Sequence, residues 1–206
     1  SRVAAITSTF TQGNLTHVEN PFSVALEGDG FFQIRTESGE LQYTRDGSFE
    51  ISPVANGNML CTSDGNPVLD AYGNAIVLPS NRVATDLVVN QDGTLAFPDG
   101  TGNPAVITDA NGRPVKFGIY QFNNPAGLSK EGSNNYSVTA ASGAAVAENG
   151  NAAVKQTKTH QYYTEASNVD VANEMVNLIV AQRAYEMNSK AIQASDEMMQ
   201  QANALR

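Results

Sequence analysis

The chain has 206 residues, of which 41% are hydrophobic and 16% charged, and its formal net charge is −9. A chain of this length can bury a substantial core, in one large domain or two small ones, and its composition excludes disorder throughout. The acidic balance repels phosphate backbones and anionic membranes, so we expect no nucleic-acid partner. No apolar stretch approaches the roughly 18 residues of a transmembrane helix.

The two ends of the chain differ in composition. The sequence opens SRVAAITSTF, without Met and without the apolar core of a signal peptide, so we expect an excised fragment or a processed chain. All 17 glycines lie between Gly13 and Gly150, and all 8 prolines lie between Pro21 and Pro125. This break predicts a β-rich domain over residues 1–165 and a C-terminal helix over residues 166–206.

Turn dipeptides divide the first 150 residues into short runs rich in Val, Ile, Phe, Tyr and Thr. This pattern is typical of an antiparallel β domain. The dipeptides are Asp29-Gly30, Asp46-Gly47, Asp64-Gly65, Asp92-Gly93, Asp99-Gly100 and Asn111-Gly112. Strands are predicted over 22–26, 31–36, 59–62, 75–78, 115–122 and 136–139. An extended segment is expected over 154–164, and a loop that is mobile or covered by a partner over 140–153.

The alternation of apolar residues predicts two hairpins in register. Each has a three-residue loop, over 45–47 and over 91–93, which keeps the apolar residues of both strands on one face. Gly47 and Gly93 would then occupy the left-handed position that ends such a loop. The predicted pairs are Tyr43 with Phe49 and Leu41 with Ile51 in the first hairpin, and Val89 with Leu95 and Leu87 with Phe97 in the second.

The C-terminal segment is predicted to be one long helix. Asn168 or Asp170 can serve as its N-cap, and Glu174 places a negative charge in the first turns. Nothing breaks the pattern before Leu205, so about 36 residues would span roughly 54 Å. A helix of this length exceeds what the core of its own domain requires, which favours a role in assembly.

Two apolar seams run along this predicted helix, and few charges separate them. The first seam is coiled-coil-like, while the second is made mostly of small residues that permit close helix approach. Glu186 and Lys190 are spaced for an i,i+4 ion pair. The first seam is Val171, Met175, Leu178, Gln182, Tyr185, Ser189, Ile192, Asp196 and Met199, the second is Val180, Ala184, Met187, Ala191, Ala194 and Met198, and the charges are Arg183, Glu186, Lys190 and Glu197.

Residues that could carry chemistry are sparse. His17 and His160 show no zinc spacing, and Cys61 sits in an apolar run that favours a buried position over a nucleophilic role. The sequence lacks the nucleophile elbow G-x-S-x-G and the spacing of a calcium-binding EF-hand. Residues 27–30 look like a tight turn between strands rather than a phosphate-binding loop. We therefore predict no catalytic residue, metal, cofactor or small-molecule substrate.

These observations leave two non-enzymatic classes open. A self-assembling structural subunit explains the long helix with two apolar seams. A soluble β-sandwich binding module, for example one that binds carbohydrate, would need an exposed aromatic platform, and the sequence contains no Trp. The two classes differ in whether association depends on residues 170–206.

Several long motifs resemble the bacterial flagellar basal-body rod and hook family. In order they are TQGNL (11–15), NPFSVAL (20–26), EGDGFFQI (27–34), YTRDGSF (43–49), SNVDV (167–171), EMVNLI (174–179) and QRAYEMNSKAI (182–192). Within that family they are most similar to the members of the distal rod, with the proximal rod members close behind. A hook protein usually carries a larger inserted domain.

The resemblance implies a fold and a structural role without enzymatic activity. Family members are exported unfolded, without a cleaved signal peptide, by the flagellar type III apparatus. They polymerise with other copies and with other rod and hook proteins into a hollow shaft that transmits torque. Their terminal helices pair and line the inner tube, and an antiparallel β domain forms the outer layer. The expected location is the extracytoplasmic basal body of the flagellum.

The resemblance also identifies candidate interaction residues. Family members begin with an N-terminal helix, and this sequence is expected to start downstream of it, so the partner of the C-terminal helix is expected to be missing. Arg183 and Lys190 match the family motif, but the sequence leaves open whether they bind a partner or keep the helix solvated. The residues expected to contact the missing helix or neighbouring subunits are Val171, Met175, Leu178, Tyr185, Ile192 and Met199, and those expected to permit close packing are Ala184, Ala191 and Ala194.

Overall fold

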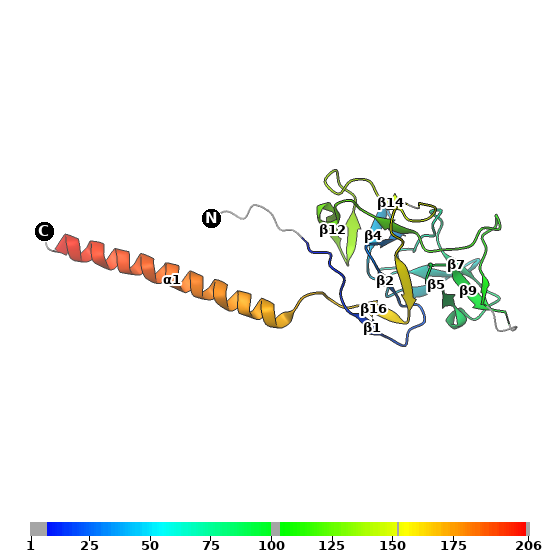
Figure 1. Cartoon of the computed structure of the whole chain (residues 1–206), viewed down its shortest axis with the longest axis horizontal. Coiled ribbons are helices and arrows are strands. Elements are labelled where there is room, and N and C mark those ends of the chain that lie inside the picture. Colours follow the sequence, from blue (N-terminus) through cyan, green and yellow to red (C-terminus); the bar gives the residue numbers. More distant parts are fainter. Residues whose placement is uncertain (1–7, 100–103, 152, 205–206) are drawn as a thin grey trace. The chain divides into compact units, whose positions relative to one another are not determined.

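The computed structural model describes residues 8–99, 104–151 and 153–204. The chain divides into two units, Ser1–Ser167 and Asn168–Arg206. The first unit carries all of the described strands, and the second carries the one described α-helix (Figure 1). The predicted fold class, an antiparallel β domain followed by a long C-terminal helix, is confirmed.

The strands of the first unit pair in five antiparallel sheets. A six-stranded sheet has the order β12-β13-β4-β3-β11-β14, two three-stranded sheets have the orders β5-β6-β7 and β10-β9-β8, and two-stranded ribbons join β2 to β15 and β1 to β16. The strands are β1 Leu15–His17, β2 Val24–Glu27, β3 Phe31–Arg35, β4 Leu41–Thr44, β5 Glu50–Val54, β6 Gly57–Cys61, β7 Val77–Pro79, β8 Val88–Val89, β9 Leu95–Pro98, β10 Pro104–Val106, β11 Ile119–Gln121, β12 Ser129–Gly132, β13 Asn135–Ser137, β14 Val146–Ala147, β15 Lys158–Gln161 and β16 Tyr163–Glu165, and two short 3-10 turns cover Ala84–Asp86 and Pro125–Gly127.

Backbone hydrogen bonds close into rings of three at several points of the β unit. In one ring, the amide of Val68 donates to Leu60, that of Leu60 to Ile76, and that of Ile76 back to Val68, each at 3.0 Å. Equivalent rings join Gln33, Leu69 and Gly118, and Leu95, Ile107 and Val115. These rings satisfy backbone groups that would otherwise be buried without partners.

Two apolar clusters stabilise the β unit. The larger one centres on Phe32, Phe49 and Phe117, whose rings lie 5.0 to 5.9 Å apart and are almost completely buried. Burying a Phe, Leu or Ile side chain contributes about 1.5–3 kcal/mol, so this cluster dominates the stability of the unit. The smaller cluster gathers Phe31 and the neighbouring aromatic rings, and Phe10 packs edge-on against it.

The hairpin predicted over residues 91–93 is confirmed. Val89 pairs with Leu95 across a three-residue loop, and the amide of Gly93 donates to the carbonyl of Asn90 at 2.9 Å. Gly93 has a φ of 84°, which is the left-handed conformation that the register required. Asp92 stabilises the turn because its carboxylate accepts from the amide and the hydroxyl of Thr94.

The hairpin predicted over residues 45–47 is wrong. β4 pairs with β3 and β13, while β5 pairs with β6, so Tyr43 and Phe49 are not partners. Gly47 has no positive φ. Its role is close approach, because its carbonyl accepts from the amide of Val24 at 3.0 Å and a Cβ at Gly47 would clash with the carbonyl oxygen of Val24. The apolar alternation is present, but β4 and β5 use it in hairpins with their other neighbours, β3 and β6, and not with each other.

The other predicted strands are largely confirmed, although the structure shortens several of them. The segment 140–153 is mostly irregular, as expected, but it contains β14, which pairs with β11, and its Glu148 is buried. The carboxylate of Glu148 accepts from the amide and the hydroxyl of Thr157, which fastens this segment to the unit. Gly100 of the predicted Asp99-Gly100 turn lies outside the described residues.

The second unit is one helix, α1, which spans Val171–Ala204. The Oδ1 atom of Asp170 accepts from the amide of Ala172 at 3.0 Å and from that of Asn173 at 3.4 Å, so of the two predicted N-caps the structure uses Asp170. Glu174 lies in the first turn, as expected. Leu205, where the pattern placed the end of the helix, lies outside the described residues. At about 1.5 Å per residue the helix is roughly 51 Å long.

Within the described residues, no helix is both long enough and apolar enough to cross a membrane.

We expect Gly47 and Gly93 to respond differently to substitution. Asn adopts the left-handed conformation with little strain, so Gly93→Asn should cost less than about 1 kcal/mol in free energy of unfolding, whereas Gly93→Val should cost about 1–2 kcal/mol. Any Cβ at Gly47 meets backbone, so Gly47→Ala and Gly47→Asn should each cost about 3 kcal/mol. Urea denaturation of the four variants measures the difference. Equal losses for Gly47→Asn and Gly93→Asn would contradict this explanation.

We also expect the cap of α1 to depend on Asp170. Asp170→Ala removes the acceptor of two amides and should destabilise the start of the helix by about 1 kcal/mol, whereas Asp170→Ser should preserve most of the cap. The check is the helical chemical shift of residues 172–175. Asp196→Ala, which changes an Asp in the interior of the helix, is the matched control. Unchanged shifts in Asp170→Ala would show that the cap is dispensable.

Candidate assembly surfaces

The helix α1 exposes large apolar side chains along its length. Every residue from 171 to 201 is exposed, including Leu178 at 59%, Ile192 at 64% and Tyr185 at 78%. Leaving such side chains in water forgoes about 1.5–3 kcal/mol each. A series of this size is typical of an association surface. The exposed large apolar side chains of α1 are Val171, Met175, Val176, Leu178, Ile179, Val180, Tyr185, Met187, Ile192, Met198 and Met199.

The apolar side chains of α1 form two seams on opposite faces. At about 3.6 residues per turn, the seam that starts at Val171 and ends at Met199 and the seam that starts at Val180 and ends at Met198 lie roughly 180° apart. Ala184, Ala191 and Ala194 belong to the second seam, where small side chains allow a partner to come close. A helix with two opposite apolar faces fits between neighbours on both sides.

Four of the six charged residues of α1 occupy a narrow strip between the two seams. Arg183, Glu186, Lys190 and Glu197 fall on one side of the helix when the same periodicity is applied. Glu186 forms its ion pair with Arg183 at 3.4 Å, rather than with Lys190 as its spacing indicated, and both partners are exposed. Surface pairs of this kind contribute little to stability, so the strip serves solvation more than packing.

The first and last strands of the β unit pair with each other. β1 runs antiparallel to β16, with Leu15 opposite Glu165 and His17 opposite Tyr163 (Figure 1). The amide of Ala166 donates to the carbonyl of Asn14 at 2.9 Å and extends the ribbon by one residue. Because the two strands are antiparallel, the chain before Asn14 and the chain after Ala166 leave the β unit from the same end of the ribbon.

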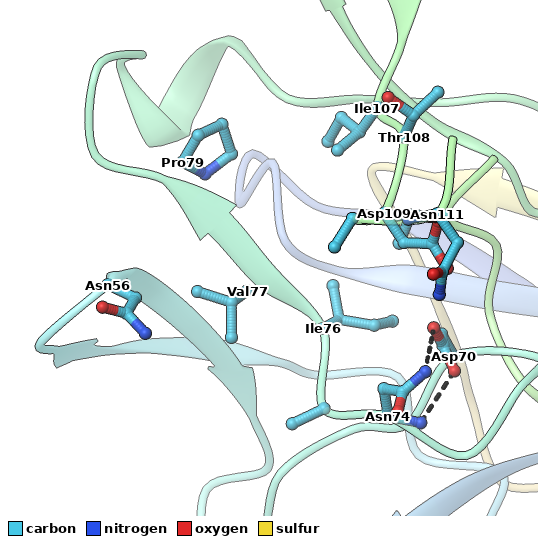
Figure 2. A pocket seen from close by; sticks show the side chains of 13 residues that line it. Asn56, Asp70, Asn74, Ile76, Val77, Pro79, Ile107, Thr108, Asp109 and Asn111 are labelled. Carbon is cyan, nitrogen blue, oxygen red and sulfur yellow. Dashed lines mark hydrogen bonds between the residues drawn. The ribbon is translucent and has the colours of Figure 1, made fainter. Parts of the chain in front are cut away.

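A pocket of about 640 Å³ lies between β7 and residues 107–115. Figure 2 shows Ile76 and Val77 near one wall, Ile107 on the other, and Asp70 and Asp109 at one end. Both carboxylates are already engaged. Asp70 accepts from the amides of residues 72 and 74, and Asp109 accepts from the amides of residues 111 and 113 and from the guanidinium of residue 113. The arrangement explains the turns around the pocket without a ligand.

The histidines and the cysteine considered as chemical groups make contacts that are explained by the fold. His160 pairs with Glu27 at 2.7 Å, and this hydrogen bond lowers the pKa of the exposed Glu27 carboxyl. His17 contacts the ring of Tyr163. Cys61 is buried, as predicted, and burial raises the pKa of its thiol, which keeps it protonated. In the part of the chain that the structure describes, no three His, Cys, Asp or Glu side chains are grouped to hold a metal.

Sequence reasoning missed one polar cluster. Arg45 and Glu165 form an ion pair between residues 120 positions apart, and both side chains are largely buried. Charged side chains are rarely buried unless they are paired. The partner of Arg45 is so distant in the sequence that only the structure identifies it. The sequence marked Arg45 only as a member of the motif YTRDGSF, and Glu165 belonged to none of the motifs.

Two family models match the chain. Residues 25–97 match the flagellar hook protein FlgE/F/G D1 domain, which covers β2 to β9 of the β unit, and residues 160–205 match the C-terminal region of the flagellar basal body rod FlgEFG proteins, which includes α1. The second match places the helix within a recognised family region. The first covers part of the larger core cluster, including Phe32 and Phe49 but not Phe117.

Similar proteins support the same family. The chain is 39% identical to the flagellar basal-body rod protein FlgG of Borreliella burgdorferi, over all of this chain and 72% of that protein. It is 37% identical to FlgG of Caulobacter vibrioides, over 95% and 68%, and 34% identical to the flagellar hook-basal body complex protein FlhP of Bacillus subtilis, over 95% and 69%. The resemblance recognised in the sequence is confirmed, and the chain belongs to the family of flagellar basal-body rod and hook proteins.

Proposed function

We propose that the chain is a structural subunit of the flagellar basal-body rod and that it polymerises through α1 into a hollow shaft. The observation that carries this proposal is the helix itself, with large exposed apolar side chains on two opposite faces. The free-energy cost of exposing these side chains to water is removed when each face is covered by another helix. The relatives named as FlgG rod proteins support the rod as the site of assembly.

The proposed partners of the first seam are the terminal helix that precedes this sequence in a longer chain and the helices of neighbouring subunits. The ribbon of β1 and β16 supports pairing within a subunit, because both terminal segments leave the β unit side by side. In this arrangement Val171, Met175, Leu178, Tyr185, Ile192 and Met199 are buried between helices, and Ala184, Ala191 and Ala194 permit close packing on the second face. Arg183 and Lys190 line the charged strip. Residues 166–206 then belong to the inner, polymerising layer and residues 1–165 to the outer one.

We further propose that the subunit reaches its site through the flagellar type III export apparatus, in the extracytoplasmic part of the basal body. A long helix and a disulfide-free β unit are compatible with passage as an unfolded chain. Its partners there are other copies of itself and other rod and hook proteins. The proposed role is mechanical and involves no catalysis.

Two alternative functions are weaker. A hook or proximal rod role within the same family would use the same helix, and the FlgG names of the similar proteins favour the distal rod. A carbohydrate-binding module would need an open aromatic platform. The exposed ring of Tyr72 does not provide one, because the guanidinium of Arg113 lies 3.9 Å above it.

Substitutions in the first seam test the proposal. Leu178→Asp and Ile192→Asp in the full-length protein place a carboxylate in the buried interface, where an unpaired charge costs about 3 kcal/mol or more per contact. Rod assembly and swimming should therefore be lost, while the thermal unfolding of the β unit should be unchanged. Asn188→Asp, between the two seams of the same helix, is the matched control and should support swimming.

Normal swimming and normal rods with Leu178→Asp and Ile192→Asp together would show that α1 is not the assembly element.

A further inference from the structure

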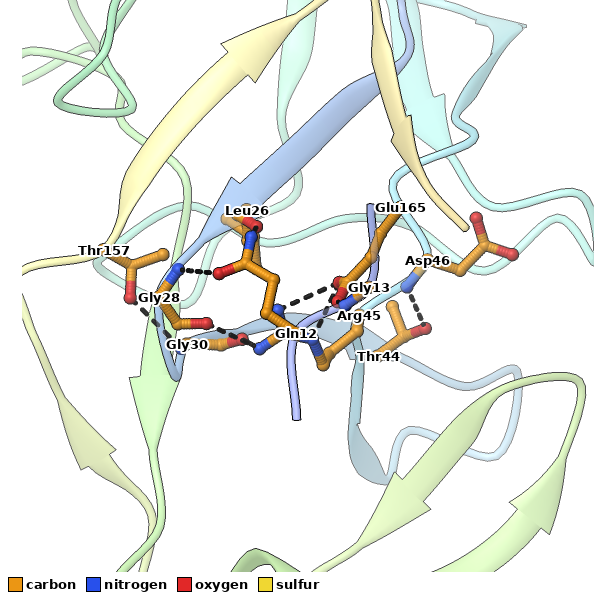
Figure 3. A network of polar contacts seen from close by, with 10 residues as sticks. All are labelled: Gln12, Gly13, Leu26, Gly28, Gly30, Thr44, Arg45, Asp46, Thr157 and Glu165. Atoms are coloured by element: carbon orange, nitrogen blue, oxygen red, sulfur yellow. Dashed lines mark hydrogen bonds and ion pairs between the residues drawn. The ribbon is translucent and has the colours of Figure 1, made fainter. Parts of the chain in front are cut away.

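A polar cluster with a largely buried ion pair at its centre lies where the two terminal segments leave the β unit (Figure 3). At its centre the Nε and Nη2 atoms of Arg45 each lie 2.9 Å from Oε2 of Glu165, and the two side chains are only 14% and 13% exposed. Arg45 follows β4 in the six-stranded sheet, whereas Glu165 ends β16. The ion pair therefore joins the exit of the chain to the sheet of the β unit.

The guanidinium of Arg45 also holds the connection between β2 and β3. Its Nη1 atom donates to the carbonyl of Gly28 at 2.9 Å and to that of Gly30 at 3.0 Å. Its carbon Cζ lies 5.7 Å from the centroid of the Phe31 ring. The planar donor set of Arg is used on three acceptors at once, which Lys could not reproduce.

The N-terminal segment is fastened to the same place. The second oxygen of Glu165, Oε1, accepts from the amide of Gly13 at 2.8 Å. The side chain of Gln12 imitates a strand, because its Nε2 donates to the carbonyl of Leu26 at 2.8 Å and its Oε1 accepts from the amide of Gly28 at 3.1 Å. Glu165 is thus shared by both terminal segments, and each of its oxygens has a charged or amide donor.

This cluster should hold the two terminal segments more firmly than the pairing of β1 with β16 does. β1 and β16 pair over three residues, and an isolated two-stranded ribbon of this size is marginal in water. Charge-assisted hydrogen bonds in a largely buried site are the stronger contacts. Removing one partner leaves the other buried without compensation, so the whole cluster should open together.

We propose that Arg45 and Glu165 form a clamp that fixes both terminal segments to the β unit at their common exit. A load carried by either segment then reaches the six-stranded sheet through Arg45, and the two segments cannot separate independently. The transmission of load rests on the proposed function, whereas the clamp itself is a property of this chain. Arg45 and Glu165 are positioning residues, since they act through the segments they hold.

Hydrogen exchange of the amides tests the clamp in the chain described here. In Arg45→Met and in Glu165→Gln, the amides of Val18 and Ala166, which donate across the ribbon, should exchange at least tenfold faster relative to the amides of Leu60 and Val68, which donate within a backbone ring. Arg113→Met, which breaks the ion pair to Asp109 in the same unit, is the matched control. It should leave the exchange of the ribbon amides unchanged.

The charge-exchanged variant Arg45→Glu/Glu165→Arg tests whether the clamp needs its specific hydrogen bonds or only the attraction between two opposite charges. A carboxylate at position 45 cannot donate to the two glycine carbonyls, and a guanidinium at position 165 cannot accept from the amide of Gly13. The ribbon should therefore stay open in this variant. Restored protection would overturn the clamp as described.

Two further results would also overturn it. Exchange accelerated by the same factor in the ribbon and in the backbone rings would mean that the ion pair only stabilises the whole unit, and unchanged ribbon exchange would mean that the segments are held elsewhere. Either result leaves the proposed function standing, because the measurement involves no polymer. Conversely, normal rods with the substituted seam of α1 would overturn the proposed function and leave the clamp intact.

Discussion

The antiparallel pairing of β1 with β16 is the constraint on which the organisation of this protein depends. It brings residues 14 and 166 into hydrogen-bonding contact, so the chain enters and leaves the β unit at the same place. Both terminal segments must then leave in the same direction. This common exit supports the proposed pairing of the terminal helices in the shaft.

The two units differ in how their stability is achieved. The β unit is self-sufficient, because Phe32, Phe49 and Phe117 form a dry centre and the backbone rings satisfy the groups around it. The helix has no comparable core in its own unit and leaves large apolar side chains in water. Its opposite seams, with a charged strip between them, are the features of an element whose core is completed by other chains. In the proposed function, the β unit therefore supplies stability and the helix supplies assembly.

Several local features were predicted correctly from the sequence, whereas the hairpins formed by β4 and β5 and the long-range contacts were not. The composition break, the Asp170 cap and the turn at Gly93 were readable because each depends on residues a few positions apart. The hairpin at Gly47 was wrong because β4 and β5 each form a hairpin with the neighbour on their other side, β3 and β6, and a close approach of Val24 selects glycine there for a different reason. The backbone rings leave no periodic pattern. The ion pair of Arg45 with a residue 120 positions away leaves none either.

The central claim is that α1 is buried between helices when the protein is assembled. Electron cryo-microscopy of the rod formed by the full-length protein tests this most directly, at a resolution that shows side chains. The account predicts that Leu178, Tyr185 and Ile192 lie against helices of the same or neighbouring subunits, and that the alanines of the second seam face a closely packed neighbour. A rod in which β units make all the contacts between subunits, with the first seam of α1 facing solvent, would contradict it.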